Sequence, residues 1–288
     1  MREFARRMKS VTAAYIEALD RIPSEQVVVN AYTYDLIPGV IDALFAELAA
    51  YVDDLFSHDQ RSNWFLNTYV EVAYQRGTAQ AFANMAKQSK VYESSRYSLV
   101  DLLRSQAYRR RVAMVRARAF EEMKGLSGGI KADMARVLAD GVGRGKGPRD
   151  IAKSLRDQAG IETRRANRIA RTEVSMALRR AKWDEESDAT ASLGLKTKLL
   201  HFSALSPTTR RSHAVRHGRL FTDEQVREWY SQDGNGINCK CSQTAVLVDD
   251  DGKPLNPAVV ERARATYQKL KARGNATWTQ TKRPKRRK

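Results

Sequence analysis

The sequence predicts an α+β protein that is predominantly α-helical, with a helical N-terminal module, a small mixed α+β domain and a flexible basic tail. Before Gly194, apolar residues recur at helical spacing in successive segments. After Gly194 the pattern alternates, which is typical of strands, and Lys and Arg dominate the end of the chain. We therefore expect a helical module at residues 1–125, a mixed domain at 126–250, and a basic helix and tail at 251–288.

The composition favours a folded protein with reduced thiols. The chain has 288 residues, of which 42% are hydrophobic, enough to fill a core. Its two cysteines, Cys239 and Cys241, are too close in sequence for an unstrained disulfide, which indicates a cytoplasmic setting. Charges recur too often near the N-terminus for a signal-peptide core, and Asp42 and Glu47 interrupt the longest apolar stretch. We expect no membrane segment.

The first 125 residues read as amphipathic helices. Apolar residues from Pro38 to Phe56 fall at helical spacing, and residues 64–85 and 97–124 continue the pattern. The last of these segments contains YRRRVAMVRARAF, whose arginines form a basic rod. Such a rod is more often a solvated face than a nucleic-acid site. No catalytic constellation is visible here, and the pair Gly128 and Gly129 predicts a break.

Shorter helical segments, separated by glycines, are expected after this break. One carries Ile130 and Met134 on a single face, and the next begins at Pro148 and ends at Gly160. The sequence GRGKG between them resembles a phosphate-binding loop. Because no strand precedes it and the GxxxxGK[ST] pattern is absent, it is interpreted as a helix-to-helix turn.

The third of these segments carries a carboxylate within its apolar stripe. Glu173 lies three residues after Ala170 and four before Ala177. Because burial of an unpaired carboxylate costs on the order of several kcal/mol, we expect an arginine to pair with it. The spacing favours a structural ion pair over a catalytic glutamate, since no nucleophile lies nearby in the sequence.

Two strands are expected beyond Gly194. The alternating residues of LKTKLLHFSAL predict the first strand, and the turn-forming Pro207 follows it. The β-branched end of CSQTAVLV predicts the second strand, which the turn DDDG closes. Together these elements predict a small α+β module.

In their order along the chain, these motifs resemble the Mu F-like domain of the phage head morphogenesis family. The resemblance covers residues 130–248 and rests on IARTEVSMALRRA, a strand, TRRSHAVRHGRLF and NCKC. It implies a structural polar cluster and no catalytic residue; the cluster comprises Arg171, Thr172, Glu173, Arg210, His213, Asn238, Cys239 and Cys241. Gly218 matches the glycine of a family DG pair, whereas Ser206, Thr208 and His217 stand where the family has Asp, Arg and Asp.

The two cysteines leave three alternatives for their chemistry. Residues two apart in a strand point to the same face, so both sulfurs can meet His213. The favoured interpretation is a reduced, hydrogen-bonded cluster without a cofactor. The second alternative is a zinc site formed by His213, His217, Cys239 and Cys241, which is disfavoured because the usual CxxC spacing is absent. A nucleophilic Cys–His pair is favoured least, because the sequence identifies no activated thiolate and no oxyanion hole.

Charge is distributed unevenly along the chain. Residues 1–60 carry five basic and ten acidic groups, whereas residues 261–288 carry eleven basic groups and one acidic group. Six of the last seven residues are basic: Lys282, Arg283, Lys285, Arg286, Arg287 and Lys288. We expect these six to bind double-stranded DNA without sequence preference by counterion release. The alternative is a tail that only aids solubility.

The resemblance implies a minor capsid protein of a tailed bacteriophage, located in the virion head interior after assembly in the host cytoplasm. We expect the helical module to dock on the portal protein and on the major capsid or scaffolding protein, and the basic surfaces to face packaged DNA. One alternative is an enzyme, a toxin-related transferase or hydrolase that uses Glu173 or Cys239. The other is a free nucleic-acid-binding protein, for which no recognised signature is present.

Overall fold

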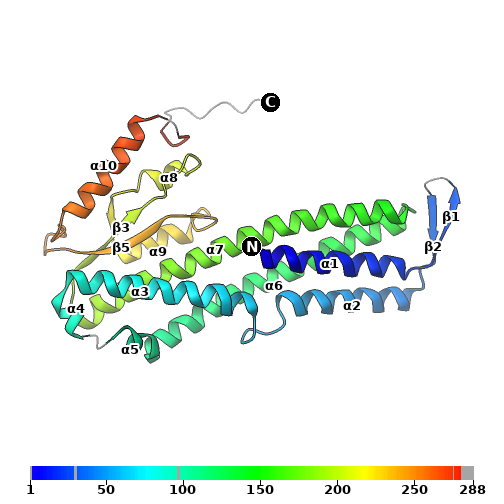
Figure 1. The fold of residues 1–288 in the computed structure, drawn as a ribbon, viewed down its shortest axis with the longest axis horizontal. Coiled ribbons are helices and arrows are strands. Elements are labelled where there is room, and N and C mark those ends of the chain that lie inside the picture. Colours follow the sequence, from blue (N-terminus) through cyan, green and yellow to red (C-terminus); the bar gives the residue numbers. More distant parts are fainter. Residues whose placement is uncertain (1, 29–30, 96–97, 275, 280–288) are drawn as a thin grey trace. The chain divides into compact units, whose positions relative to one another are not determined.

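The computed structural model describes residues 2–28, 31–95, 98–274 and 276–279. The chain divides into two compact units, each built from two separate segments. Unit 1 comprises residues 1–68 and 115–171, and unit 2 comprises residues 69–114 and 172–288. This division differs from the consecutive ranges 1–125, 126–250 and 251–288 that the sequence suggests. The predicted fold class is confirmed, because helices dominate and both sheets are small and antiparallel (Figure 1).

Unit 1 packs four helical segments around one core. They are α1 (Arg2–Asp20), α2 (Pro38–Phe56), the C-terminal part of α6 (Gln106–Gly143) and the N-terminal part of α7 (Pro148–Leu193). The Phe4 ring meets Trp64 and Phe65 edge to face, with centroid distances of 4.9 and 5.5 Å. Lys131 Nζ lies 2.6 Å from Asp53 Oδ2 and so links α6 to α2. The helix predicted from Pro38 to Phe56 is confirmed with the same bounds.

The hairpin of β1 (Ser24–Val28) and β2 (Ala31–Tyr34) connects α1 to α2, and the sequence reading missed it. Every described residue of β1 is exposed, so the hairpin lacks the alternating burial that would identify a strand. Tyr34 anchors it: the Tyr34 hydroxyl donates to the Lys146 carbonyl at 2.7 Å.

The predicted breaks at Gly128–Gly129 and at Gly160 are wrong, because α6 and α7 continue through them. A glycine inside a helix costs only about 1 kcal/mol relative to alanine. Burial of neighbouring residues such as Leu126, Ile130 and Leu155 offsets that cost. The turn predicted at GRGKG is confirmed, since α6 ends at Gly143 and α7 begins at Pro148. Within it, Gly145 has φ +63°, and a Cβ there would lie 2.6 Å from the Tyr32 carbonyl oxygen.

Unit 2 joins helices to a three-stranded antiparallel sheet of order β4-β3-β5. Its strands are β3 (Thr197–Phe202), β4 (Leu220–Phe221) and β5 (Ser242–Leu247), so the two predicted strands are confirmed. The π-helical turn η1 (Leu66–Val70) leads into the unit. The remaining helices are α3 (Glu71–Gln88), α4 (Lys90–Ser95), α5 (Leu99–Arg104), α8 (Arg211–Ala214), α9 (Asp223–Ser231), α10 (Ala258–Ala272), the start of α6 and the end of α7.

Side-chain amides of α3 cover the free edge of β5. Asn84 Nδ2 and Gln88 Nε2 donate to the Ala245 carbonyl at 2.8 and 2.9 Å, and the Leu247 amide donates to Gln88 Oε1 at 3.2 Å. An uncovered edge strand offers unpaired backbone groups to other chains, so these bonds protect β5. This contact explains why residues 69–114 belong with the C-terminal half of the chain.

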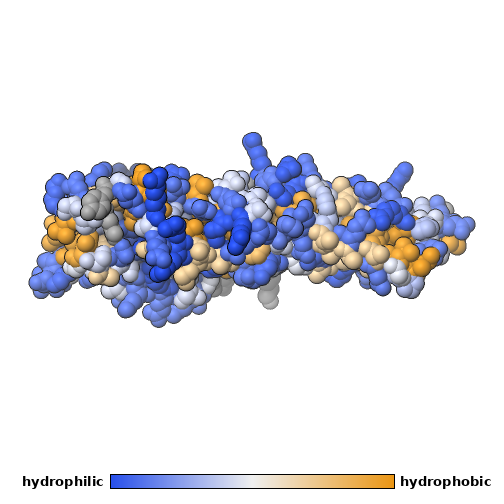
Figure 2. All heavy atoms as spheres, turned by 90° about the horizontal axis from the view of Figure 1, so that it is seen from below, coloured by the Kyte–Doolittle hydropathy of each residue, from blue (hydrophilic) through white to orange (hydrophobic). Residues whose placement is uncertain are grey.

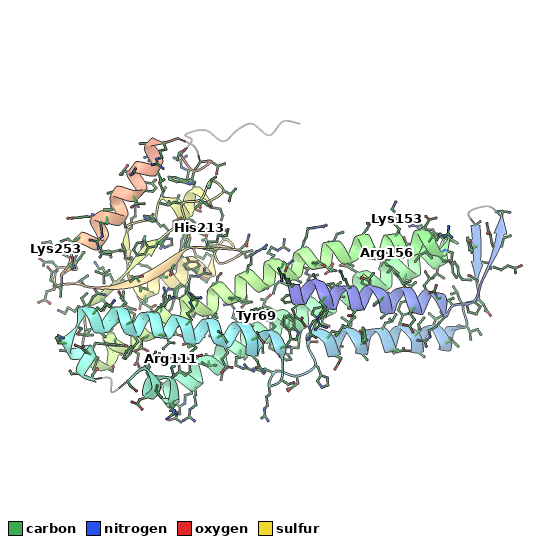
Figure 3. The ribbon with its side chains drawn as sticks, viewed as in Figure 1. Tyr69, Arg111, Lys153, Arg156, His213 and Lys253 are labelled. Carbon is green, nitrogen blue, oxygen red and sulfur yellow. The ribbon has the colours of Figure 1, made fainter. Side chains whose placement is uncertain are left out.

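The predicted basic rod lies on α6, and part of it serves the fold. Arg111, labelled in Figure 3, lies 3.5 Å from Glu185 and 3.4 Å from Asp188 on α7. Arg116 donates to the Gln60 carbonyl at 2.9 Å, whereas Arg109 and Arg110 are exposed. In the part of the chain that the structure describes, no helix has the length and apolar character to cross a membrane.

Candidate functional site

The site lies where the loop before β5 meets α8 and the C-terminal part of α7. Asn238 has φ +51°, a left-handed conformation that Asn tolerates better than most residues. Its backbone amide donates to Thr172 Oγ1 on α7 at 2.9 Å. Arg210 donates to the carbonyls of Gly234, Asn235 and Ile237 at 3.0, 2.9 and 3.3 Å. These contacts fix the loop that carries both cysteines.

His213, Cys239 and Cys241 converge at the centre of this site. Their exposed fractions are 2%, 4% and 5%, and the two sulfurs each lie 3.4 Å from His213 Nδ1. His213, labelled in Figure 3, lies on α8. A pocket of about 510 Å³ adjoins all three side chains, and Thr209, Arg210 and Asn238 also line it.

The pKa values of the two thiols shift in opposite directions. Hydrogen bonding with Cys241 is the main cause that lowers the pKa of Cys239, and His213 and the Arg179 guanidinium lower it further. The same bond, together with burial, raises the pKa of Cys241. This contact therefore favours the charged form of Cys239 and the neutral form of Cys241.

Arg179 supports the cysteine loop from α7. It is 1% exposed, and its Nη1 donates to the carbonyls of Cys239 and Cys241 at 3.0 and 3.3 Å. Its guanidinium lies 4.7 Å from the centre of the Tyr230 ring. The sequence reading missed this residue, although it lies three residues after Met176 and four before Trp183, within the buried stripe of α7.

A buried amide and a neutral histidine lie beside the cysteines. Gln243 accepts from Trp183 Nε1 at 3.0 Å and donates to the Tyr230 hydroxyl at 3.1 Å and to His201 Nδ1 at 3.0 Å. Burial, with a contribution from Arg216, lowers the pKa of His201 to about 3. His201 is therefore neutral near pH 7, and this network joins β3, β5 and α7.

Some residues of the predicted polar cluster contact one another, and others lie apart. Thr172, Arg210, His213, Asn238, Cys239 and Cys241 meet as described above. Glu173 is buried at 5% exposure, as its spacing predicts, and its pairing with an arginine stays a prediction. Arg171 is exposed and belongs to unit 1. Gly218 has φ +74°, and a Cβ there would lie 2.9 Å from the Arg264 amide nitrogen, so glycine is required.

His217 does not join the predicted four-residue zinc set. The Ser203 amide donates to His217 Nδ1 at 3.0 Å, and the ring packs edge to face against Phe202. Among the described residues, the group with metal-ligand spacing consists of His213, Cys239 and Cys241 alone. The predicted DNA-binding residues Lys282, Arg283, Lys285, Arg286, Arg287 and Lys288 lie outside the described residues.

Residues 132–244 match the family described as Phage Mu protein F like protein. The match covers most of the range 130–248 over which the motifs resemble that family, so the predicted Mu F-like domain is confirmed. It includes α8, α9, β3, β4 and both cysteines of the site. No curated protein and no solved structure is significantly similar to the chain.

Proposed function

We propose that this chain, which carries a Mu F-like domain at residues 132–244, is a minor capsid protein that acts without enzymatic activity in phage head morphogenesis. The observation that carries the proposal is the family match, supported by the way its motif residues are used. Thr172 on α7 accepts from the Asn238 amide, and Arg210 donates to carbonyls of the same loop, so both residues hold that loop in place. A structural role explains these contacts without requiring a substrate.

A docking surface for other head proteins is the second part of the proposal. Most of the face in Figure 2 is hydrophilic, with hydrophobic residues in separate groups. Five large apolar residues of unit 1 are highly exposed near the β1–β2 hairpin and the start of α2: Val27, Val28, Leu36, Ile37 and Val40. Contiguous exposed apolar surface marks protein-interaction sites, and these five exposed residues come from one short stretch of the chain. We assign this hairpin surface to the portal protein or to the major capsid or scaffolding protein.

Introduction of negative charges into the hairpin surface tests this docking. The triple variant Val28→Asp, Ile37→Asp and Val40→Asp is expected to lower co-purification with the portal protein or the capsid protein at least about tenfold, because charges replace apolar contacts. Val91→Asp is the matched control, because Val91 is 55% exposed but belongs to unit 2. Equal capture of both variants and the unmodified chain would contradict the assignment.

Point substitutions test docking more sharply than a deletion of residues 1–60. Such a deletion removes α1 and α2, which supply Phe4, Met8, Leu48 and Phe56 to the core of unit 1. Loss of head incorporation would then report unfolding as well as lost contacts. The substituted residues are exposed, so their replacement leaves that core intact.

Contact with packaged DNA is proposed for the basic end of the chain. With six basic residues after Thr281, truncation there is expected to reduce affinity for duplex DNA strongly at low salt. Full neutralisation of about six phosphates predicts a slope near −5 in log K against log salt concentration. Fluorescence anisotropy with two unrelated duplexes measures the affinity and its dependence on salt concentration. A chain with residues 282–288 in shuffled order is the control and should bind like the original; salt-independent binding would oppose the proposal.

A further inference from the structure

His213, Cys239 and Cys241 offer three lone-pair donors to a single point. The two sulfurs lie 3.4 Å from the same His213 Nδ1, and the three donor atoms lie within 4.8 Å of one another. A ring nitrogen can take part in only one direct hydrogen bond, so His213 Nδ1 bonds directly to only one of these sulfurs, and the other sulfur keeps its contact with the neighbouring thiol. One cation at the centre would satisfy all three donors.

The sulfur–nitrogen distances are close to those of a tetrahedral zinc site. Zinc binds thiolate sulfur at about 2.3 Å and imidazole nitrogen at about 2.0 Å, and tetrahedral angles then separate sulfur from nitrogen by roughly 3.5 Å. The observed separations of 3.4 Å are close to this value, so only a small adjustment is needed. Two thiolates and one imidazole in tetrahedral geometry favour zinc over the harder ions magnesium and calcium.

Neighbouring groups hold His213, Cys239 and Cys241 in fixed orientations, as hydrogen-bonding partners of metal ligands do. The Cys241 amide donates to Cys239 Sγ at 3.3 Å, and Arg179 donates to both cysteine carbonyls. The His213 ring packs against Trp229 with a centroid distance of 4.6 Å, which fixes its orientation. The donors are therefore held in place by the fold.

We propose that His213 Nδ1, Cys239 Sγ and Cys241 Sγ bind one zinc ion, with the fourth coordination position open to the pocket of about 510 Å³. Water or a small anion takes that fourth position. His217 does not, because it lies outside the group of donor atoms within 4.8 Å of one another. This inference departs from the cofactor-free cluster that the CxC spacing favours. It is independent of the role in head assembly.

Metal analysis of the full chain, purified with reductant and without chelator, tests the proposal. We expect about one zinc per chain by mass spectrometry of the metal, and less than about a tenth of that in His213→Ala and in Cys239→Ser/Cys241→Ser. His58→Ala is the matched control, because His58 is exposed and lies in unit 1. His213→Cys is expected to retain zinc, since a third thiolate replaces the imidazole.

Cobalt reconstitution gives a second readout that a packing role would not produce. Cobalt in this site is expected to show the intense visible bands of tetrahedral thiolate coordination, and the bands should be absent in His213→Ala. Chelation alone should lower the melting temperature of the unmodified chain and leave that of His213→Ala unchanged. Zinc far below one per chain after reconstitution, or equal zinc in His213→Ala, would overturn the proposal and indicate a packing cluster.

Discussion

Replacement of Gly77 by leucine is expected to destabilise unit 2 by about 3 kcal/mol or more. Gly77 lies on α3 where this helix crosses α7, and a Cβ there would overlap the Leu178 carbonyl oxygen and lie 2.7 Å from Ala181 Cβ. The overlap is with backbone, so no side-chain rotation can relieve it. The helices must separate, and Asn84 and Gln88 would then move away from the β5 edge that they cover.

Urea unfolding followed by tryptophan fluorescence measures this effect. Three of the four tryptophans, Trp183, Trp229 and Trp278, belong to unit 2, so the signal reports mainly on that unit. Gly128→Ala on α6 is the control: a Cβ there meets nothing within 4 Å, and helix propensity predicts a gain of up to about 1 kcal/mol. An unfolding midpoint for Gly77→Leu equal to that of the unmodified chain would mean that α3 does not pack on α7 as described.

Periodicity predicted the elements whose burial is regular. The helix Pro38–Phe56 has one buried stripe, and β3 and β5 have the alternation or β-branched run of strands, so all three were found. The continuity of α6 and α7 was not found, because a glycine gives the same local signal inside a packed helix as at its end. Only burial of the surrounding face distinguishes the two cases.

No pattern within residues 69–114 indicates that they belong to the same unit as the C-terminal part of the chain. Their place in that unit depends on bonds from Asn84 and Gln88 to Ala245, far along the chain, and a single sequence does not display such pairs. Family resemblance and the CxC spacing placed Cys239, Cys241 and His213 together. The contacts of Arg179 and Gln243 could not be predicted in this way, because they depend on the packing of α7 against β5. His217 lies outside the group with metal-ligand spacing among the described residues, and sequence proximity to His213 does not reveal its bond to Ser203.

Proteomic analysis of purified phage heads tests the central claim most directly. A minor capsid protein is expected at a low, fixed number of copies in heads that contain DNA and in precursor heads that lack it. Nuclease treatment and high salt should leave it in place if protein contacts hold it, since both remove proteins bound only to DNA. Presence at constant stoichiometry in both kinds of head is the predicted result. Absence from purified heads, with the protein recovered only in the soluble lysate, would contradict a role as a structural component of the head.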